Sequence, residues 1–329
     1  MAEILEKCPV CRALIDQEDL FCANCGREAP DRSRPAAAPS TLKATHNFLC
    51  DGCGASMSYD ASAQNLRCPF CGSEKLTTQK DAQVLAPDRV VPFRIAFAEA
   101  QQILRQWMGR SFWHPSDLAR RATIETIQPV YVPYWVFSAR TWTFWTADTS
   151  DVPFGARASW RPLSGEHHGQ YNGLLISASS VLTPAETHEI SPFDLAQGLP
   201  PDQIDLTNAV YEQFRVQRRY ARPLAQQGLE ASEMEACRQY VPGNVRNLHV
   251  NVRLDGLASE PVLVPVWVMA YRYEDRVFRF LINGQTGKAT GTAPRDWKKA
   301  ALIIGVIAAI VLGGIAALAI CGGAAAAAG

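Results

Sequence analysis

The chain has 329 residues and a mass of 36.1 kDa, which is enough for about two or three domains. Hydrophobic residues make up 47% of it and charged residues 19%, a composition that excludes a globally disordered protein. Lysine and arginine together number 32, as do aspartate and glutamate. This balance argues against a general binder of polyanions, which needs a basic excess. The N-terminus has early acidic residues and no long apolar run, so we expect no cleaved signal peptide.

Eight of the ten cysteines lie within the first 71 residues, as four Cys-x-x-Cys pairs. Without a signal peptide they should face a reducing cytosol, where disulfides do not persist, so the pairs indicate metal sites. The two pairs of each site are separated by 10 and 14 residues, a spacing typical of tetrahedral four-cysteine zinc sites. The predicted ligands are Cys8, Cys11, Cys22 and Cys25 at one site, and Cys50, Cys53, Cys68 and Cys71 at the other.

Both sites look structural, because cysteine fills all four positions and leaves none for water or substrate. We therefore expect two structural Zn²⁺ ions, and iron is the alternative that a four-thiolate site leaves open. A redox role is disfavoured, since a redox Cys-x-x-Cys motif comes singly and beside a βαβ pattern.

Composition divides the chain into segments. Residues 29–45 are rich in Pro, Ala, Ser and charge, without apolar periodicity, and this is typical of a flexible linker. We expect a first zinc ribbon over residues 1–28, that linker over 29–45, a second zinc ribbon over 46–78, an α+β body over 88–296 and a transmembrane helix over 300–320.

The body has the patterns of mixed α and β structure. A helix is expected over 94–108, and a second helical region over 206–238, broken by Pro223. Runs rich in β-branched and aromatic residues predict strands over 127–139, 141–147, 173–179, 248–254, 261–273 and 277–282.

Two of these runs resemble each other. Residues 129–136 and 261–268 match at six of eight positions, 132 residues apart, and helical sequence precedes both. This repeat indicates two related halves, and the alternative is that both are simply apolar strands. Prolines in both copies favour edge strands or bulges, since proline cannot donate to a ladder.

The run at 300–320 has 21 residues and no charge, so at about 1.5 Å per residue it matches a hydrocarbon core of about 30 Å. Arg295, Lys298 and Lys299 precede it, which predicts a single-pass protein of the cytoplasmic (inner) membrane with its N-terminal bulk in the cytoplasm. Small residues recur every fourth position and suggest association between such helices, with simple Ala/Gly richness as the alternative. The stripe consists of Ala301, Gly305, Ala309, Gly313 and Ala317, and Cys321 follows it.

No motif in the sequence predicts an active site, and we expect that the protein is not an enzyme. The pair His167-His168 is predicted to lie in a polar turn, and Cys237 to be a small apolar residue of a helix. Residues 284–288 resemble a phosphate loop but lack its spacing, so Asn283-Gly284 instead predicts a hairpin turn.

Taken together, these features resemble a family of bacterial zinc-ribbon membrane proteins. The matching pieces are the cysteine ribbons, residues 131–135, residues 264–267, and residues 283–288 followed by the terminal apolar run. Members are often labelled as similar to the primosomal helicase PriA or to the TFIIB zinc ribbon. Some relatives neighbour SPFH-domain and phage-shock-type membrane proteins. The resemblance implies work at a membrane alongside such proteins.

The leading hypothesis is a membrane-tethered, non-enzymatic zinc-ribbon adaptor or scaffold that recruits protein partners at the cytoplasmic face of the membrane. Residues 1–80 carry nine basic and ten acidic residues, and each zinc with four thiolates adds two negative charges. Because phosphate neutralisation dominates nucleic-acid affinity, such ribbons suit protein contacts better. The alternative is a nucleic-acid-binding zinc-ribbon factor held at the membrane, for which Arg215, Arg218, Arg219 and Arg222 would supply a basic helix face.

Overall fold

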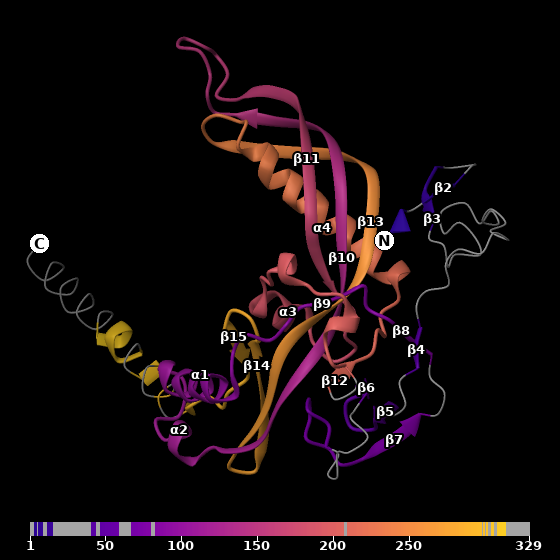
Figure 1. The fold of residues 1–329 in the computed structure, drawn as a ribbon. Coiled ribbons are helices and arrows are strands. Elements are labelled where there is room, and N and C mark those ends of the chain that lie inside the picture. The colour runs from indigo at the N-terminus through magenta and orange to yellow at the C-terminus, as the bar shows by residue number, and fades with distance from the viewer. Residues whose placement is uncertain are drawn as a thin grey trace, which may run out of the picture.

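The computed structural model describes residues 3–4, 6–8, 12–15, 41–43, 47–58, 67–79, 83–206, 209–297, 299, 301, 304–305 and 308–313. Most of this chain forms one mixed sheet of 11 strands (Figure 1). Its spine is a pair of long antiparallel strands, β10 (Thr123–Thr149) and β13 (Val245–Tyr273). Between residues 130 and 137, β10 is buried at every position, which explains its unbroken apolar sequence.

The remaining strands pair around this spine. In the large sheet they are β1 (Glu3–Ile4), β5 (Asn47–Cys50), β6 (Ser56–Ser58), β7 (Leu76–Gln79), β9 (Arg89–Val90), β11 (Arg161–Ser177), β12 (Val210–Glu212), β14 (Arg276–Asn283) and β15 (Ala289–Gly291). Two small sheets pair β2 (Glu6–Lys7) with β3 (Leu14–Ile15), and β4 (Thr41–Lys43) with β8 (Gln83–Leu85). The helices are α1 (Phe97–Arg110), α2 (Leu118–Arg121), α3 (Pro184–Ile190) and α4 (Arg218–Arg238), with 3₁₀ turns η1 (Leu195–Gln197) and η2 (Pro201–Gln203).

The two copies of the eight-residue repeat lie side by side and pair with each other. Val132 lies opposite Val264, its equivalent, and the register runs symmetrically outward to Trp135 opposite Pro261 and Pro129 opposite Trp267. A local two-fold axis, which relates β10 to β13, therefore passes through the centre of the sheet.

The same relation extends to the neighbouring elements. The short strand β9 runs parallel to β13 at Val262, and β12 runs parallel to β10 at the equivalent Val130. Each short strand leads into a helix, α1 or α4, and each helix is followed by one long strand of the spine.

Side-chain contacts repeat with the fold. The indole nitrogen of Trp267 donates to the carbonyl of Ile95 at 2.9 Å, and that of Trp135 donates to the carbonyl of Val216 at 2.8 Å. Phe93 packs on Trp267 with ring centroids 5.5 Å apart, as Phe214 packs on Trp135 at 5.3 Å. Each half thus inserts a Phe-Arg-Ile or Phe-Arg-Val segment under the tryptophan of the other half.

The spine prolines lie in central strands, so the expectation of edge strands is wrong. Pro133 falls where the neighbour of β10 changes from β12 to β11, and Pro265 falls where the neighbour of β13 changes from β9 to β14. The carbonyl oxygens of both prolines accept from that side, at Ala178 N (2.9 Å) and Gly284 N (2.8 Å). Their nitrogens face the gap between two neighbouring strands, where no ladder donor is needed.

The two ends of the spine carry different helices, as Figure 1 shows. We call α1, β14 and the ends of β10 and β13 near them the base, and α4, β11 and the opposite ends of β10 and β13 the arm. In the arm the residues of β10 from 139 to 147 alternate between burial against α4 and exposure.

Several expectations from sequence need correction. The helix expected at 94–108 is confirmed as α1, with its bounds shifted. The strands expected separately at 127–139 and 141–147 are one strand, as are those at 248–254 and 261–273. Pro223 does not break α4, because its ring is on the exposed side of the second turn and only one helical hydrogen bond is lost there.

The predicted fold class, separate zinc ribbons with an α+β body and a C-terminal transmembrane helix, is wrong. The strands around Cys50–Cys71 continue the large mixed sheet, because β6 pairs with β12 (Tyr211 opposite Ser58). Residues 9–11 and 16–40, which include most of the expected first ribbon and linker, lie outside the described residues.

The transmembrane helix expected at 300–320 is also wrong. Within the described part of the chain, no helix is long and apolar enough to cross a membrane. Within this run the structure describes residues 301, 304–305 and 308–313, which are helical. Residues 314–320, including Ala317, lie outside the described residues. The expected single-pass inner-membrane location is wrong for the same reason, whereas the association through the small-residue stripe stays a prediction.

Candidate metal centre

The chain around Cys50 and Cys68 forms two turns of the same shape. In the first, Cys50 N donates to Ala55 O at 2.8 Å and Gly54 N donates to Cys50 O at 2.8 Å. In the second, Cys68 N donates to Ser73 O at 2.9 Å and Gly72 N donates to Cys68 O at 2.8 Å. Gly54 and Gly72 have φ of 77° and 74°, which a residue without a Cβ adopts at little cost. The glycine after each second cysteine therefore closes a turn that brings both sulfurs to one side.

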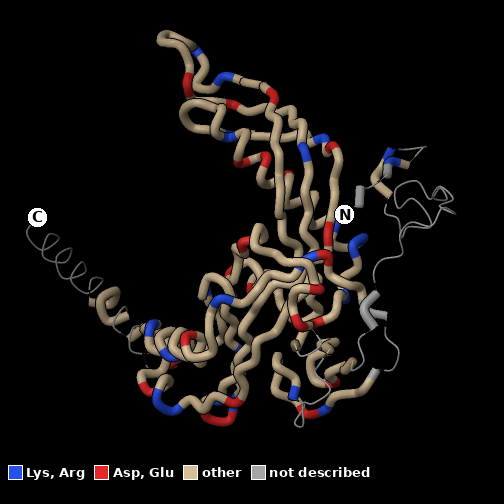
Figure 2. The backbone as a smooth tube through the Cα atoms, in the orientation of Figure 1, with Lys and Arg blue, Asp and Glu red and all other residues tan. Residues whose placement is uncertain are grey.

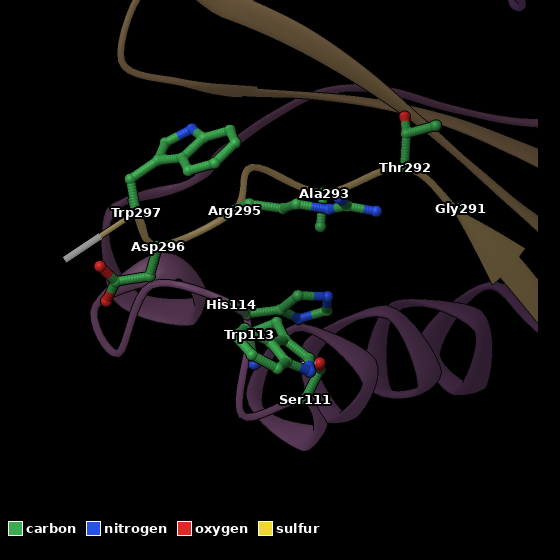
Figure 3. Close-up of a pocket in the computed structure, with 9 residues that line it drawn as sticks. All are labelled: Ser111, Trp113, His114, Gly291, Thr292, Ala293, Arg295, Asp296 and Trp297. Atoms are coloured by element: carbon green, nitrogen blue, oxygen red, sulfur yellow. Dashed lines mark hydrogen bonds between the residues drawn. The ribbon is translucent and has the colours of Figure 1, made fainter. Parts of the chain in front are cut away.

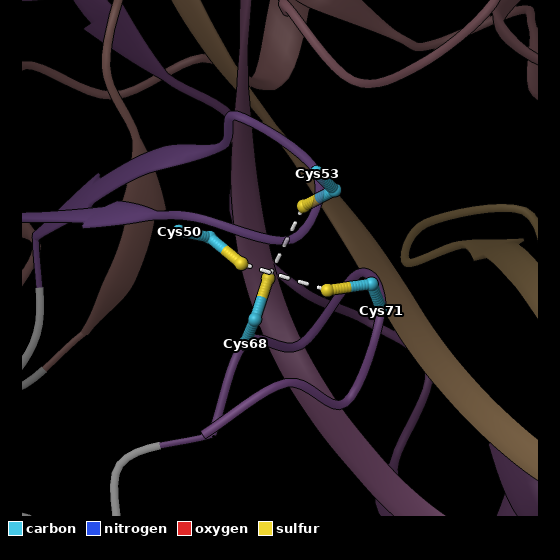
Figure 4. A group of neighbouring side chains, drawn as sticks. All are labelled: Cys50, Cys53, Cys68 and Cys71. Carbon is cyan, nitrogen blue, oxygen red and sulfur yellow. Dashed lines mark hydrogen bonds between the residues drawn. The ribbon is translucent and has the colours of Figure 1, made fainter. Parts of the chain in front are cut away.

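The two turns face each other and bring four sulfurs together (Figure 4). The Sγ atoms of Cys50 and Cys71 are 3.5 Å apart, as are those of Cys53 and Cys68, and all four lie within 4.8 Å of one another. Zinc bound tetrahedrally at about 2.3 Å requires sulfurs about 3.8 Å apart, so the arrangement fits such an ion after a small expansion. These four cysteines could hold a metal ion.

Burial and mutual hydrogen bonds perturb these thiols. A hydrogen bond from Cys68 lowers the pKa of Cys53 to about 5, and the same bond raises the pKa of Cys68. Burial raises the pKa of Cys71 to about 11. Without a metal, the four cysteines thus share protons through hydrogen bonds between neighbouring sulfurs. A bound cation would replace these hydrogen bonds by metal–sulfur bonds and release the protons.

The metal centre is joined to the body by a buried polar network. Gln213, which follows β12, donates from Nε2 to Asn47 Oδ1 at 2.6 Å and accepts at Oε1 from Ser56 Oγ at 2.9 Å. Arg215 donates to the same Ser56 hydroxyl at 2.7 Å. Met57 and Phe70, 0% and 2% exposed, continue this contact into the core beneath β10. The centre is therefore both hydrogen-bonded to the body and packed against the sheet.

Of the first predicted site, only Cys8 lies among the described residues; Cys11, Cys22 and Cys25 lie outside them. Cys8 N donates to Ala13 O at 2.7 Å and Arg12 N donates to Cys8 O at 2.9 Å, the same pair of bonds as in the other two turns. Arg12 takes the place of the glycine at φ 61°. The ligand set Cys8, Cys11, Cys22 and Cys25 stays a prediction.

A second cluster of metal-ligating side chains was missed from sequence. His167 lies in β11, so the predicted turn is wrong, and it meets Glu233 and Cys237 of α4 with donor atoms within 4.8 Å of one another. The sequence signal was present: Leu163, Gly165, His167, Gly169 and Tyr171 alternate with the polar residues Ser164, Glu166, His168 and Gln170, which is the period-two pattern of a strand.

The Glu233 carboxylate is fully buried and well satisfied. Burial alone would raise its pKa, but hydrogen bonds from Thr141, His167 and Tyr171 outweigh burial and hold the pKa below its usual value. Burial and the Glu233 charge raise the pKa of the Cys237 thiol to about 11. At neutral pH the carboxylate is therefore ionised and the thiol protonated.

A cavity of about 650 Å³ lies at the base, beyond the end of α1 (Figure 3). It is lined by Ser111, Trp113, His114, Gly291, Thr292, Ala293, Arg295, Asp296 and Trp297. His114 Nδ1 lies 3.1 Å from the carbonyl oxygen of Met108, and its ring packs on Trp107 with centroids 4.9 Å apart. These contacts hold the imidazole to its own helix end.

The hairpin turn predicted at Asn283-Gly284 is confirmed between β14 and β15. The Asn283 side chain accepts from the backbone of Gln285 (2.8 Å) and Thr286 (3.1 Å) and donates to Ile190 O (2.8 Å). Lys288 Nζ donates to Ser191 O at 2.6 Å. The polar side chains of this turn, Asn283 and Lys288, thus form hydrogen bonds within the protein that stabilise the turn.

The basic helix face expected from four arginines is not present as such. Arg218 is buried and lies over the Trp135 ring, 4.9 Å from its centroid. Arg222 is buried and donates to Leu14 O at 3.3 Å, while Arg215 is bound to Ser56. Three of the four cations therefore have structural roles.

Comparison with known proteins adds one relative. The chain is 26% identical over 316 residues to a Bacillus subtilis (strain 168) protein described as the uncharacterized protein YdjG, and the match covers 90% of this chain and 91% of the relative. No family model matches. No solved structure matches.

Proposed function

We propose that the protein is a non-enzymatic zinc-ribbon adaptor whose metal centre presents a rigid surface to protein partners. The observation that carries this is the closed cysteine centre at Cys50, Cys53, Cys68 and Cys71, built into the edge of the large sheet through β6 and β12. Four thiolates occupy all four coordination positions of a tetrahedral zinc ion. Zinc at this site therefore stabilises the fold and has no open position for a substrate. A second ion at Cys8, Cys11, Cys22 and Cys25 belongs to the same proposal.

The charge around the centre favours protein over nucleic acid. Among the described ribbon residues, the two negative charges of Asp51 and Glu74 balance the two positive charges of Arg67 and Lys75. A zinc ion with four thiolates adds two negative charges. Figure 2 shows basic and acidic residues interspersed along the body. A phosphate backbone is bound by an excess of Lys and Arg, and three of the four clustered arginines are already engaged within the fold.

The ribbon also offers an exposed strand for contact. Among the described residues, the order of the large sheet ends at β7, and Thr77 and Thr78 on that strand are exposed. The unpaired backbone groups of an edge strand can accept a further strand from a partner, with side chains setting specificity.

The test is site-specific photo-crosslinking in cells that express the full chain. A crosslinker at Thr78 should capture a defined protein, and one at Arg253, exposed on β13 of the arm, is the matched control. The Thr78 adduct should disappear in Cys68→Ser. The adaptor proposal is wrong if the two positions capture the same proteins irrespective of the metal centre.

A second measurement separates the rival function. Titration of purified protein with single- and double-stranded DNA at rising salt should show weak binding. Tight binding that falls steeply with salt would mean that the protein neutralises several phosphates, and would favour the nucleic-acid factor.

A further inference from the structure

The arm contains a buried cluster that the cysteine ribbons do not explain. The helix α4 lays one face on the sheet, with buried residues at every fourth position: Ala221, Ala225, Leu229, Glu233 and Cys237. Beneath the last two of these, His167 reaches up from β11. Glycines on β11 allow the close approach, since a Cβ at Gly169 would collide with the Glu233 carboxylate and with the Thr141 hydroxyl.

We propose that His167, Glu233 and Cys237 bind a zinc ion that clamps α4 to the arm. The three donor atoms lie within 4.8 Å of one another, and Nδ1 of His167 is 2.7 Å from Oε2 of Glu233. Tetrahedral zinc with bonds of about 2.0–2.3 Å needs donor atoms about 3.3–3.8 Å apart. The His167–Glu233 pair therefore opens by about half an ångström when the ion enters between the two groups.

The donor set selects the ion. One imidazole nitrogen, one carboxylate oxygen and one sulfur suit zinc, whereas calcium and magnesium prefer oxygen ligands alone. The three protein ligands leave one position, which a water fills. Binding releases the thiol proton of Cys237 to solvent and shifts the proton of the neutral His167 ring from Nδ1, where it bonds Glu233, to Nε2. Two coordination bonds then replace the hydrogen bond between His167 and Glu233.

Two further contacts support a built site. The Cys237 thiol is 0% exposed, and no hydrogen-bond partner for it is found within the described part of the chain. Glu233 keeps a second oxygen, Oε1, on the Thr141 hydroxyl at 2.5 Å, and Gly169 N donates to that hydroxyl at 3.0 Å. A carboxylate ligand fixed by outer hydrogen bonds in this way is typical of metal sites.

The neighbouring histidine supplies a matched control. His168 lies on the opposite face of β11, where its ring packs on Trp142 with centroids 4.8 Å apart. A change there alters the same strand and the same residue type but leaves the cluster intact.

The experiment is a metal count on the full-length protein after it is stripped, reloaded with Zn²⁺ and freed of excess metal. The variants His167→Gln and Cys237→Ala should each bind one equivalent less than the wild type, and His168→Gln should bind the same amount. Cys68→Ser should lose a different equivalent, so that the double variant Cys68→Ser/Cys237→Ala loses two. Equal metal content in the wild type, His167→Gln and Cys237→Ala would overturn the proposal.

A measurement on the wild type covers the case in which a variant fails to fold. In protein loaded with cobalt(II), a site with one thiolate should add absorption with a weaker sulfur-to-cobalt band than that of the four-cysteine centre. The proposal is wrong if every bound cobalt ion has the spectrum of a four-thiolate site.

Discussion

The base and the arm are two versions of the same unit with different interiors. Each places a helix on the paired ends of β10 and β13 and adds one more strand, β14 at the base and β11 in the arm. The base interior is apolar and aromatic, with Leu104, Met108 and Phe280 buried. The arm, at the end of α4, buries Glu233 and Cys237 beside His167.

This difference shows that the architecture does not require the polar cluster. At the base, the position equivalent to Thr141 is Tyr273, whose hydroxyl donates to Asp117 at 2.8 Å near the surface. A buried carboxylate costs free energy unless it is fully bonded, so its presence in one unit and its absence in the other point to a local task.

The two halves also differ at their short strands. β9 is bridged by Leu199 through Val90, while the equivalent β12 accepts β6 and with it the whole cysteine centre. The two-fold relation of the body is therefore broken where the ribbon joins, and partner binding at the ribbon would act on one half only.

The largest effect should come from loss of the cysteine centre. Cys68→Ser should remove one metal equivalent and unfold β5–β7, because a structural zinc contributes on the order of 10 kcal/mol to the folding of small domains. The base and arm ends of the β10–β13 spine should persist, since their core clusters contain no residue of the cysteine turns. Hydrogen exchange measured by mass spectrometry should show lost protection at residues 47–58 and 67–79 alone.

The control for this change is Thr78→Ala, at an exposed position of β7. It should leave both metal content and exchange unchanged. Retained protection of β5–β7 in Cys68→Ser would show that packing against the sheet, rather than the ion, folds the ribbon.

The next effect concerns the two helices. Leu104→Ala in α1 and Leu229→Ala in α4 each delete a buried side chain, 0% and 1% exposed, and should destabilise the protein by about 2–5 kcal/mol. Because both ends share β10 and β13, each variant should still unfold in one thermal transition. Two separated transitions in calorimetry would show that base and arm are independent units.

A smaller and more discriminating effect is expected at the two equivalent tryptophans. Trp135→Phe and Trp267→Phe each remove an indole that donates to a carbonyl of the other half, at Val216 and Ile95. Leaving a buried carbonyl unpaired costs about 1–3 kcal/mol, so chemical denaturation should show two similar losses. A loss at only one of the two would mean that the halves are related in backbone but not in energetics.

The sequence predicted those features that depend on local spacing. The cysteine turns need only a Cys-x-x-Cys segment and a following glycine, so Cys50, Cys53, Cys68 and Cys71 could be grouped without knowledge of the fold. Apolar runs likewise placed the strands of the body.

Features that depend on distant pairing could not be predicted in this way. Prolines in β10 and β13 suggested edges, because the sequence does not show that each faces a gap between two neighbouring strands. The alternation around His167 was overlooked, and its partners Glu233 and Cys237 lie some 70 residues away on α4. The apolar run at 300–320 was interpreted from its length, its lack of charge and the basic residues before it.

The smallest effect should appear at the base, where Glu186 of α3 meets Arg279 of β14, with Glu186 Oε1 2.6 Å from Arg279 Nη2. Burial would raise the pKa of Glu186, but bonds from the Thr183 backbone and from Arg279 outweigh burial and lower it. A carboxyl group whose pKa is lower in the folded protein than in the unfolded chain stabilises the fold at every pH above its unfolded pKa. This stabilisation is lost as the pH falls through the folded pKa. Glu186→Gln should therefore lower stability by about 1 kcal/mol at neutral pH, and its difference from the wild type should vanish at acid pH. The matched control is Glu235→Gln, at an exposed ion pair on α4 in the arm, which should unfold at the same temperature as the wild type at neutral pH. If stability falls with acid pH in Glu186→Gln as it does in the wild type, the contact between α3 and β14 is stabilised by packing rather than by charge.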